Sequence, residues 1–265
     1  MWIRVWFKMI VRVVTANLRK SDADDGAHGW PHRRDLCART LAEAQPDLIC
    51  TQECRPDQRD DLLARLDGFQ AWGLARTPQD GFPVNAMFWR ADRWDVRDRG
   101  GYWLSTSPHV PGSRGWDAAS IRLANWLVLE HRQTGLRLRL ISTHLDHVGA
   151  FARRRSATML VQDASAWPAD LPQVLGGDFN EGDEEPAPAH LLAHGWRDAV
   201  ASAAGTPEST FHGFQGSAWT GDQRRIDWIL VRGAVQVRST NVIRTAGPDT
   251  WPSDHWFVCA DLEIG

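Results

Sequence analysis

Lysine and tyrosine are almost missing from this chain of 265 residues. Lys8 and Lys20 are the two lysines and Tyr102 is the one tyrosine, so arginine supplies 28 of the 30 basic residues. The formal net charge is −3, which excludes a polybasic protein that binds nucleic acid through bulk electrostatics. A phosphate-bearing partner must therefore meet a local site, and arginine suits such a site because its guanidinium binds phosphate through two hydrogen bonds.

Zinc-type cysteine pairs and long apolar runs are absent as well. The four cysteines are Cys37, Cys50, Cys54 and Cys259. Since no CxxC pair occurs among them, we expect free, buried thiols. Charged residues interrupt the apolar stretch 1–14, which is too short for a membrane span and unlike a signal peptide. We therefore expect a cytoplasmic protein without a membrane segment, in which residues 1–8 are an extension ahead of the fold.

Hydrophobic periodicity predicts one domain of alternating strands and helices. Strands are expected at 9–16, 47–52, 70–76, 84–90, 93–104, 119–130, 136–143, 172–177, 224–231, 234–244 and 256–263, and helices at 31–45, 56–66, 149–166 and 186–194. No GxGxxG, P-loop, internal repeat or linker is visible. Long strands with few helices favour an α/β fold in which two mixed β-sheets pack face to face with helices outside, a four-layer α/β/β/α sandwich.

Polar side chains follow six of these apolar runs, so a rigid sheet delivers them to its rim. The six segments are residues 15–19, 50–55, 142–147, 176–180, 225–229 and 251–255. Four of their side chains offer only oxygen ligands, which suits Mg²⁺ or Mn²⁺ better than zinc. These four are Asn17, Glu53, Asp178 and Asn180. His255, with a carboxylate from Asp227, supplies the oriented imidazole that a general base requires.

This ordered set resembles the endonuclease/exonuclease/phosphatase superfamily, which includes DNase I, exonuclease III type AP endonucleases, sphingomyelinases, inositol polyphosphate 5-phosphatases and deadenylases. The resemblance extends from about Val11 to Leu262. It implies the DNase I-like fold and metal-dependent cleavage of phosphoesters. The run Ser-Thr-His-Leu-Asp-His-Val-Gly at 142–149, together with segments 102–105, 111–119 and 210–214, is similar to a poorly characterised bacterial subgroup.

The resemblance assigns a role to each motif residue. Glu53 resembles the principal Mg²⁺ ligand, Asn17 its companion, and Asp254 a further metal contact. Asp178 and Asn180 resemble the pair that positions the attacking water and the scissile phosphate oxygen.

The histidines complete the implied site. His255 resembles the catalytic imidazole, and Asp227 the carboxylate that holds it in one tautomer. His144 stands where exonuclease III type enzymes have tyrosine and matches the DNase I, sphingomyelinase and deadenylase branches, which counts against an AP endonuclease. The implied mechanism is a single in-line attack by water on phosphorus, without a covalent intermediate.

Five further residues are candidate substrate contacts, and three of them have a structural alternative. They are Arg55, Trp116, Arg122, His147 and His212. Arg55 is almost as well explained as a solvated loop arginine, Arg122 as an ion-pair partner, and His212 as a loop-stabilising residue.

Several neighbouring residues carry weaker hypotheses. Asn125 is a second candidate on the strand of Arg122, and Asp146 is better explained as a turn cap than as a cleft residue. We interpret the run 153–155 as a solvated face rather than a phosphate clamp. Trp30, Trp103 and Trp116 are expected near the rim, where they could stack a base or sugar, and Trp126, Trp228 and Trp256 are expected in the core.

The leading hypothesis is a Mg²⁺- or Mn²⁺-dependent phosphodiesterase, and specifically a nuclease, with a phosphoester such as nucleic acid as its partner. The alternative enzyme is a phosphomonoesterase that acts on a small sugar, inositol or nucleotide phosphate. A catalytically inactive binding module ranks last, because all six segments keep their polar residues. We expect a monomer, and the sequence points to no protein partner.

Overall fold

The computed structural model describes residues 8–78, 85–222 and 224–265. Twelve strands form two mixed sheets of six strands each in this part of the chain. The first sheet has the order β11 (Val235–Ile243), β12 (Phe257–Ile264), β1 (Met9–Asn17), β2 (Leu48–Gln52), β4 (Met87–Arg90) and β3 (Phe69–Trp72). The second has the order β5 (Trp94–Trp103), β6 (Leu123–His131), β7 (Arg137–His144), β8 (Gln173–Asp178), β10 (Asp227–Arg232) and β9 (Arg197–Asp198).

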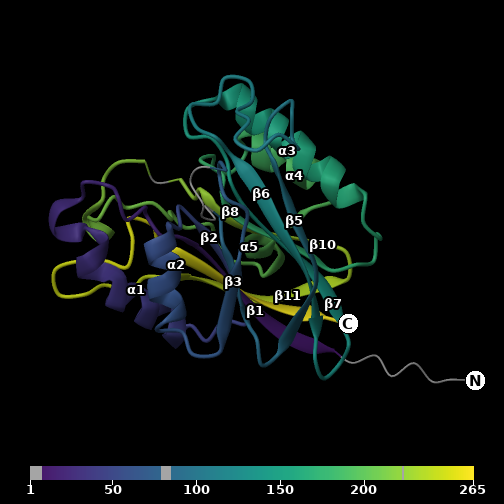
Figure 1. Ribbon diagram of the computed structural model, residues 1–265, viewed down its shortest axis with the longest axis horizontal. Helices are drawn as coiled ribbons and strands as arrows, with labels where there is room; N and C mark the ends of the chain where they lie inside the picture. The colour runs from purple at the N-terminus through teal and green to yellow at the C-terminus, as the bar shows by residue number, and fades with distance from the viewer. Residues whose placement is uncertain (1–7, 79–84, 223) are drawn as a thin grey trace, which may run out of the picture.

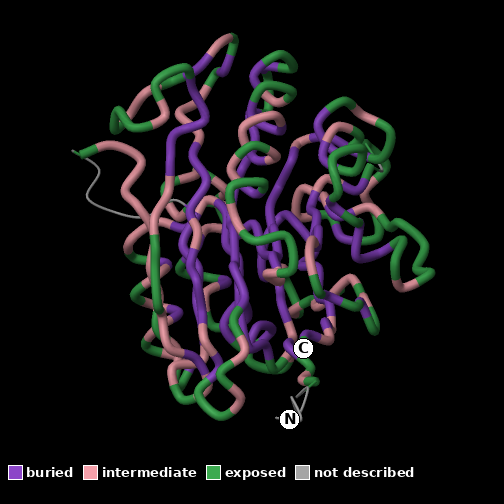
Figure 2. Tube along the Cα trace, turned by 90° about the vertical axis from the view of Figure 1, so that its right-hand side faces the viewer, coloured by how far each residue is buried: buried purple, intermediate pink, exposed green. Residues whose placement is uncertain are grey.

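The two sheets pack face to face over a shared apolar core. Alternate residues of the strands point into it, including Val11 and Val13 from the first sheet and Leu138 and Leu140 from the second. This alternation is what the period of two in β-strands requires. Figure 2 shows the strands as a buried centre, with the exposed segments on the outside.

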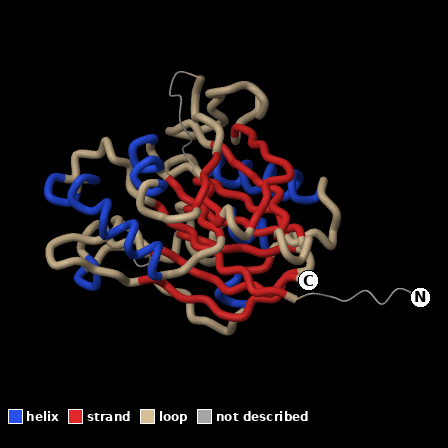
Figure 3. The backbone as a smooth tube through the Cα atoms, turned by 60° about the horizontal axis from the view of Figure 1, so that its bottom comes forward, coloured by secondary structure: helices blue, strands red, loops and turns tan. Residues whose placement is uncertain are grey.

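Helices cover the outer face of each sheet. Helices α1 (Trp30–Glu43) and α2 (Pro56–Leu63) share a core with the first sheet, whereas α3 (Ala150–Ser165) and α4 (Pro186–Ala193) share one with the second. Figure 1 shows the two helix pairs on opposite sides of the strands, and Figure 3 shows the strands between the helices. The predicted four-layer sandwich is therefore confirmed.

Short elements complete the description. They are the helix α5 (Ala199–Ser202) and the 3-10 turns η1 (Gly26–His28) and η2 (Gly216–Ala218). The sequence did not predict these three or the two-residue strand β9, because such short segments have no periodicity to detect. Among the helices that the structure describes, none combines the length and the apolar character that crossing a bilayer requires.

Most predicted elements lie where the periodicity placed them, and the errors are at their ends. The strand expected at 70–76 ends at Trp72, and the strand expected at 119–130 begins at Leu123. Of the predicted extension 1–8, residues 1–7 lie outside the described residues, as does part of the strand expected at 84–90. The four cysteines are free and buried, as expected.

Three tryptophan predictions need correction. Trp30 and Trp103 were expected at the rim, but both are buried, and the Trp103 indole donates to the Arg76 carbonyl oxygen at 2.7 Å. Trp126 was expected in the core but is only half-buried and packs its edge against Trp167. Trp228 and Trp256 are buried, as predicted.

Candidate active site

The strand register brings three of the predicted polar residues side by side at the same end of three neighbouring strands of the second sheet. His144 is the Cα partner of Asp178 in the parallel pair β7 and β8, and Asp178 is the partner of Asp227 in the antiparallel pair β8 and β10. The three residues therefore form a row across three adjacent strands. Each is nearly inaccessible to solvent, so the sheet holds the row rigidly.

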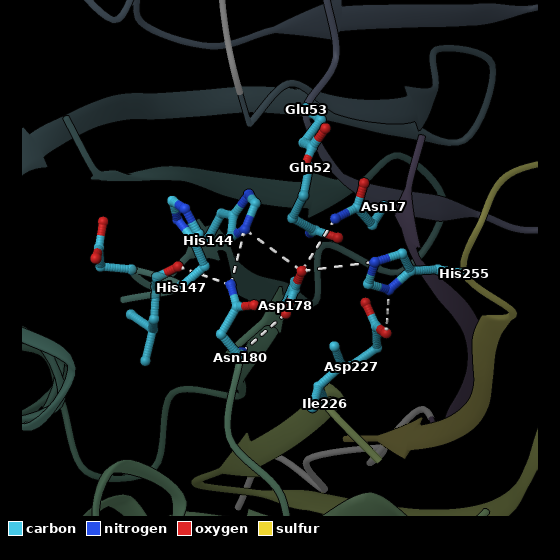
Figure 4. Close-up of polar contacts among 12 residues, drawn as sticks. Asn17, Gln52, Glu53, His144, His147, Asp178, Asn180, Ile226, Asp227 and His255 are labelled. Atoms are coloured by element: carbon cyan, nitrogen blue, oxygen red, sulfur yellow. Dashed lines mark hydrogen bonds and ion pairs between the residues drawn. The ribbon is translucent and has the colours of Figure 1, made fainter. Parts of the chain in front are cut away.

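The first sheet joins this row through Asn17, the last residue of β1. Its amide Nδ2 donates to Asp178 Oδ2 at 3.0 Å, and its Oδ1 accepts from the Arg19 backbone N–H at 2.9 Å. Figure 4 shows Asp178 at the centre of the site, with Asn17 and His255 on one side and His144 and Asn180 on the other.

Two residues leave the strands with positive φ angles. Glu53 follows β2 at φ 58°, and Asn180 follows β8 at φ 51°. Non-glycine residues are uncommon in this region and are concentrated at functional sites. The turn places both side chains on the wall of the same cleft. Asn180 Nδ2 lies 3.1 Å from His144 Nε2, while Glu53 accepts from the Lys20 backbone N–H at 3.0 Å.

The loop that precedes β12 supplies the last motif. His255 Nδ1 lies 2.8 Å from Asp227 Oδ2, and His255 Nε2 lies 4.0 Å from Asp178 Oδ2. Ser253, wholly buried, donates to the Asn17 carbonyl oxygen at 2.6 Å and so ties this loop to β1. The geometry is that of an imidazole oriented by a carboxylate, with its second nitrogen facing the cleft.

Burial and mutual repulsion shift the pKa values of the central groups. Burial, reinforced by the charge of Asp227, raises the pKa of Asp178 to about 7. Burial alone would lower the pKa of His255, but the charge and hydrogen bond of Asp227, together with the charges of Asp254 and Asp178, raise it to about 10. Burial and the positive charge of Arg122 hold the pKa of His144 well below its ordinary value, so that ring is neutral.

Around these groups lies a cleft of about 630 Å³. Nine of the predicted site residues line it, namely Glu53, Arg55, Arg122, His144, His147, Asp178, Asn180, Asp254 and His255. The sequence did not identify its other lining residues, which are Arg19, Lys20, Arg76, Ser120, Ile121, Phe211, Asp222, Arg224 and Ile226. Most of these belong to loops, where no local pattern marks a residue as part of a site.

Two predicted substrate contacts do not line the cleft. His212 is buried against Trp256, with ring centroids 3.9 Å apart, and its Nδ1 accepts from the Gly216 backbone N–H at 3.2 Å. This position fits the second interpretation of His212, in which it stabilises its own loop and does not contact the substrate. Trp116 is half-buried outside the cleft, and the Arg155 guanidinium lies over its ring at 5.8 Å. Asp227 does not line the cleft either, but it is hydrogen-bonded to His255 and orients that imidazole.

Two neighbours of the predicted contacts are structural as well. Asn125 is buried, and its amide Nδ2 donates to the Asn85 carbonyl oxygen at 3.1 Å. In the arginine run, Arg154 and Arg155 are exposed as predicted, but Arg153 is paired with Glu181 at 2.6 Å.

The residues at the cleft fit a hard divalent cation. Asp254 is buried, and burial with the charge of Glu53 raises the pKa of its carboxyl. Asp178, Asp227 and His255 each bring a ligand-type atom within 4.8 Å of the others, and among the described residues the buried Asp227 Oδ1 has no hydrogen-bond partner. Crowded, desolvated carboxylates repel one another, and an oxygen-preferring cation would relieve that repulsion. His255 and Asp227 are hydrogen-bonded to each other at 2.8 Å, whereas the charge of Glu53 acts on Asp254.

Comparisons of sequence and of structure show which known proteins the chain resembles. The sequence model of the Endonuclease/Exonuclease/phosphatase family matches residues 14–255. The chain belongs to this family. A family protein from Bacteroides thetaiotaomicron has 28% identity and a TM-score of 0.90, covering 98% of this chain and 97% of that one. A mannosyl-6-phosphatase from the same organism has 28% identity and a TM-score of 0.89, covering 95% of this chain and 99% of that one.

A curated relative is also similar over part of the chain. It is an uncharacterised protein of Acanthamoeba polyphaga mimivirus, 28% identical over 131 residues. The match covers 43% of this chain but only 19% of the viral protein's length. The family match and the buried carboxylate and histidine cluster together identify a phosphoesterase fold with a potential metal site.

Proposed function

We propose that this protein is a divalent-metal-dependent phosphomonoesterase that acts on a small phosphorylated molecule, a sugar phosphate in particular. The observation that carries the proposal is the cleft. Its volume of about 630 Å³ lies in the range of small-molecule sites, and six cationic side chains line it around the catalytic row. These six are Arg19, Lys20, Arg55, Arg76, Arg122 and Arg224.

Charge favours a phosphomonoester over the phosphodiester that the sequence favoured. A monoester carries about two negative charges near neutral pH and a diester one, so a cation-lined cleft gains more from a monoester. A nuclease needs positive charge that follows an extended backbone, whereas this chain has a net charge of −3. The similarity to a mannosyl-6-phosphatase over 95% of the chain supports the same choice.

Arg122 is the best-placed phosphate ligand among the six. Its side chain is only 12% exposed and lines the cleft, where the charges of Asp146, Asp178 and Glu53 act on its guanidinium. Burial lowers the pKa of Arg122, which nevertheless remains charged. We infer that it binds the phosphoryl oxygens together with the Asn180 amide.

Asp178 and His255 flank the position proposed for the attacking water, and the distance between Asp178 Oδ2 and His255 Nε2 is 4.0 Å. A water molecule between them can give up its proton as it attacks phosphorus, and the buried Asp227 keeps the imidazole in place. The sequence assigned this step to His255 alone. We infer that Asp178 takes this proton instead, because the raised pKa of His255 favours the charged form of its imidazole. A cation held by Glu53 and Asp254 would neutralise charge on the phosphoryl oxygens.

A substrate panel tests the proposal. The full-length protein with Mg²⁺ is incubated with mannose 6-phosphate, p-nitrophenyl phosphate, bis(p-nitrophenyl) phosphate and single-stranded DNA, each with and without EDTA. We expect EDTA-sensitive hydrolysis of the two monoesters and much slower cleavage of the two diesters. Faster cleavage of the diesters would restore the nuclease hypothesis, and no turnover of any substrate would favour the binding module.

A further inference from the structure

A contact between two cleft residues fixes the tautomer of His147. Arg122 Nη2 lies 3.1 Å from His147 Nδ1. A guanidinium has five N–H donors and no acceptor, so His147 Nδ1 must accept this hydrogen bond. The neutral ring then carries its proton on Nε2, the only nitrogen left to hold it. Because His147 lines the cleft, its Nε2–H is the donor that the ring can offer to a ligand there.

Asp146 holds this pair in position. Its carboxylate, only 1% exposed, accepts from the backbone N–H groups of Ala119, Ser120, Val148 and Gly149 at 2.8 to 3.0 Å. Its Oδ2 also lies 3.5 Å from Arg122 Nε. One buried carboxylate thus joins the loop before β6 to the loop after β7. His147 and Arg122 therefore stand on a rigid wall, although the His147 ring itself is exposed.

His147 and His255 lie at opposite ends of the catalytic row. Asp227, the partner of His255, starts β10, and the row continues through Asp178 on β8 and His144 on β7. Arg122 directly precedes β6, the next strand in the sheet. Neighbouring strands are about 4.8 Å apart, so β10 and β6 lie roughly 14 Å from each other. In an in-line displacement, the attacking water and the leaving oxygen also occupy opposite sides of phosphorus.

We propose that His147 is a further catalytic residue, whose Nε2–H donates a hydrogen bond to the leaving-group oxygen of the substrate. This inference rests on the proposed function, because it takes the attacking water to lie between Asp178 and His255. In the step, the bond from water oxygen to phosphorus forms and the bond to the leaving oxygen breaks with its electron pair. The proton of water passes to the Asp178 carboxylate, beside the charged imidazole of His255, and the leaving alkoxide takes a proton from solvent. His147 keeps its own proton throughout.

The effect of this hydrogen bond on the rate of hydrolysis should depend on the leaving group. A donor to the leaving oxygen matters most for a basic alkoxide, such as the oxygen of a sugar phosphate, and little for p-nitrophenolate, which is stable without it. A donor to a non-bridging phosphoryl oxygen would instead affect both substrates equally.

The test is a comparison of His147→Ala with wild type on mannose 6-phosphate and p-nitrophenyl phosphate. We expect kcat to fall roughly 100-fold on the sugar phosphate and by less than about 5-fold on the aryl phosphate. His147→Gln, which keeps a side-chain N–H donor, should recover part of the loss on the sugar phosphate. Equal losses on the two substrates, or no loss on either, would overturn the proposal.

The tautomer itself is tested without turnover. Long-range ¹H–¹⁵N correlation spectra of the wild-type protein, with the His147 signals assigned by their absence in His147→Gln, should show the proton on Nε2. A proton on Nδ1 would refute the inference. If wild type hydrolyses none of the phosphoesters, the proposed function fails before any variant is compared, so the two failures are distinguishable.

Discussion

Replacement of Asp146 by Asn should destabilise the protein by an amount that its contacts define. Oδ1 of Asp146 accepts three backbone N–H groups, and Oδ2 accepts the Ser120 N–H at 2.9 Å. In Asp146→Asn, one of these oxygens becomes an NH₂ group that faces donors, and the remaining bonds lose their charge assistance. Each hydrogen bond to a charged group contributes about 1.5 to 3 kcal/mol, so we expect the free energy of unfolding to fall by about 3 kcal/mol at pH 7.

The loss should depend on pH in a defined direction. Burial alone would raise the pKa of Asp146, but the backbone N–H groups of Gly149, Ala119, Ser120 and Val148 together hold it well below its usual range. The stabilisation is thus present above the unfolded-state pKa of about 3.9 and is lost as the pH falls through the folded-state pKa. The difference between wild type and variant should therefore shrink below about pH 4.

Urea denaturation at several pH values measures both effects. Asp117→Asn is a matched control, because Asp117 lies in the loop before β6 that Asp146 contacts and, within the described part of the chain, accepts two backbone N–H groups, those of Phe151 and Ala152. Its loss should be about 1 kcal/mol, the usual contribution of a helix cap. If the two variants lost equal stability, or if the Asp146→Asn difference stayed constant between pH 7 and pH 3, the reasoning would be wrong.

Three further variants test other parts of the structure. Arg33→Met should lower the free energy of unfolding by on the order of 4 kcal/mol in urea titrations, because the buried guanidinium donates to four backbone carbonyls. Gly177→Ala should lower both kcat and melting temperature, since an added Cβ would lie 2.5 Å from the Thr143 carbonyl oxygen, directly before Asp178; unchanged kinetics would contradict this. Glu53→Gln should weaken Mn²⁺ binding in calorimetric titration by about tenfold or more, and an unchanged affinity would exclude Glu53 as a ligand.

The sequence predicts the three residues of the catalytic row well because a short local pattern marks each of them. His144, Asp178 and Asp227 are each the terminal residue of a largely buried strand, and such strands are the most recognisable pattern in the chain. Their convergence follows from strand order, which the family resemblance supplied. Their catalytic roles remain predictions that the variants above test.

The other residues that line the cleft were harder to predict, because long-range contacts determine their positions. Arg76, Ser120 and Arg224 come from irregular segments whose positions no local pattern encodes. His212 shows the opposite error. Its motif suggested a cleft residue, but its backbone N–H donates to the Asp254 carbonyl oxygen, and its ring turns away to pack on Trp256.

Asp146 carried a usable signal, and the sequence interpretation as a turn cap followed it. An aspartate two residues after the His144 position and three before Gly149 is well placed to accept backbone N–H groups at the start of a helix. The turn-capping interpretation was right. Its reach to the loop before β6, which brings Arg122 and His147 together, depends on tertiary contacts that no local pattern encodes.

The most direct test of the central claim is phosphate release from mannose 6-phosphate by wild type beside Asp178→Asn, with circular dichroism to confirm that both are folded. With Mg²⁺ we predict turnover by wild type, its loss on addition of EDTA, its return with excess Mg²⁺, and a fall of at least about 10³-fold in kcat for the folded variant. Turnover that resists EDTA, or a folded Asp178→Asn protein with nearly wild-type kcat, would contradict the account.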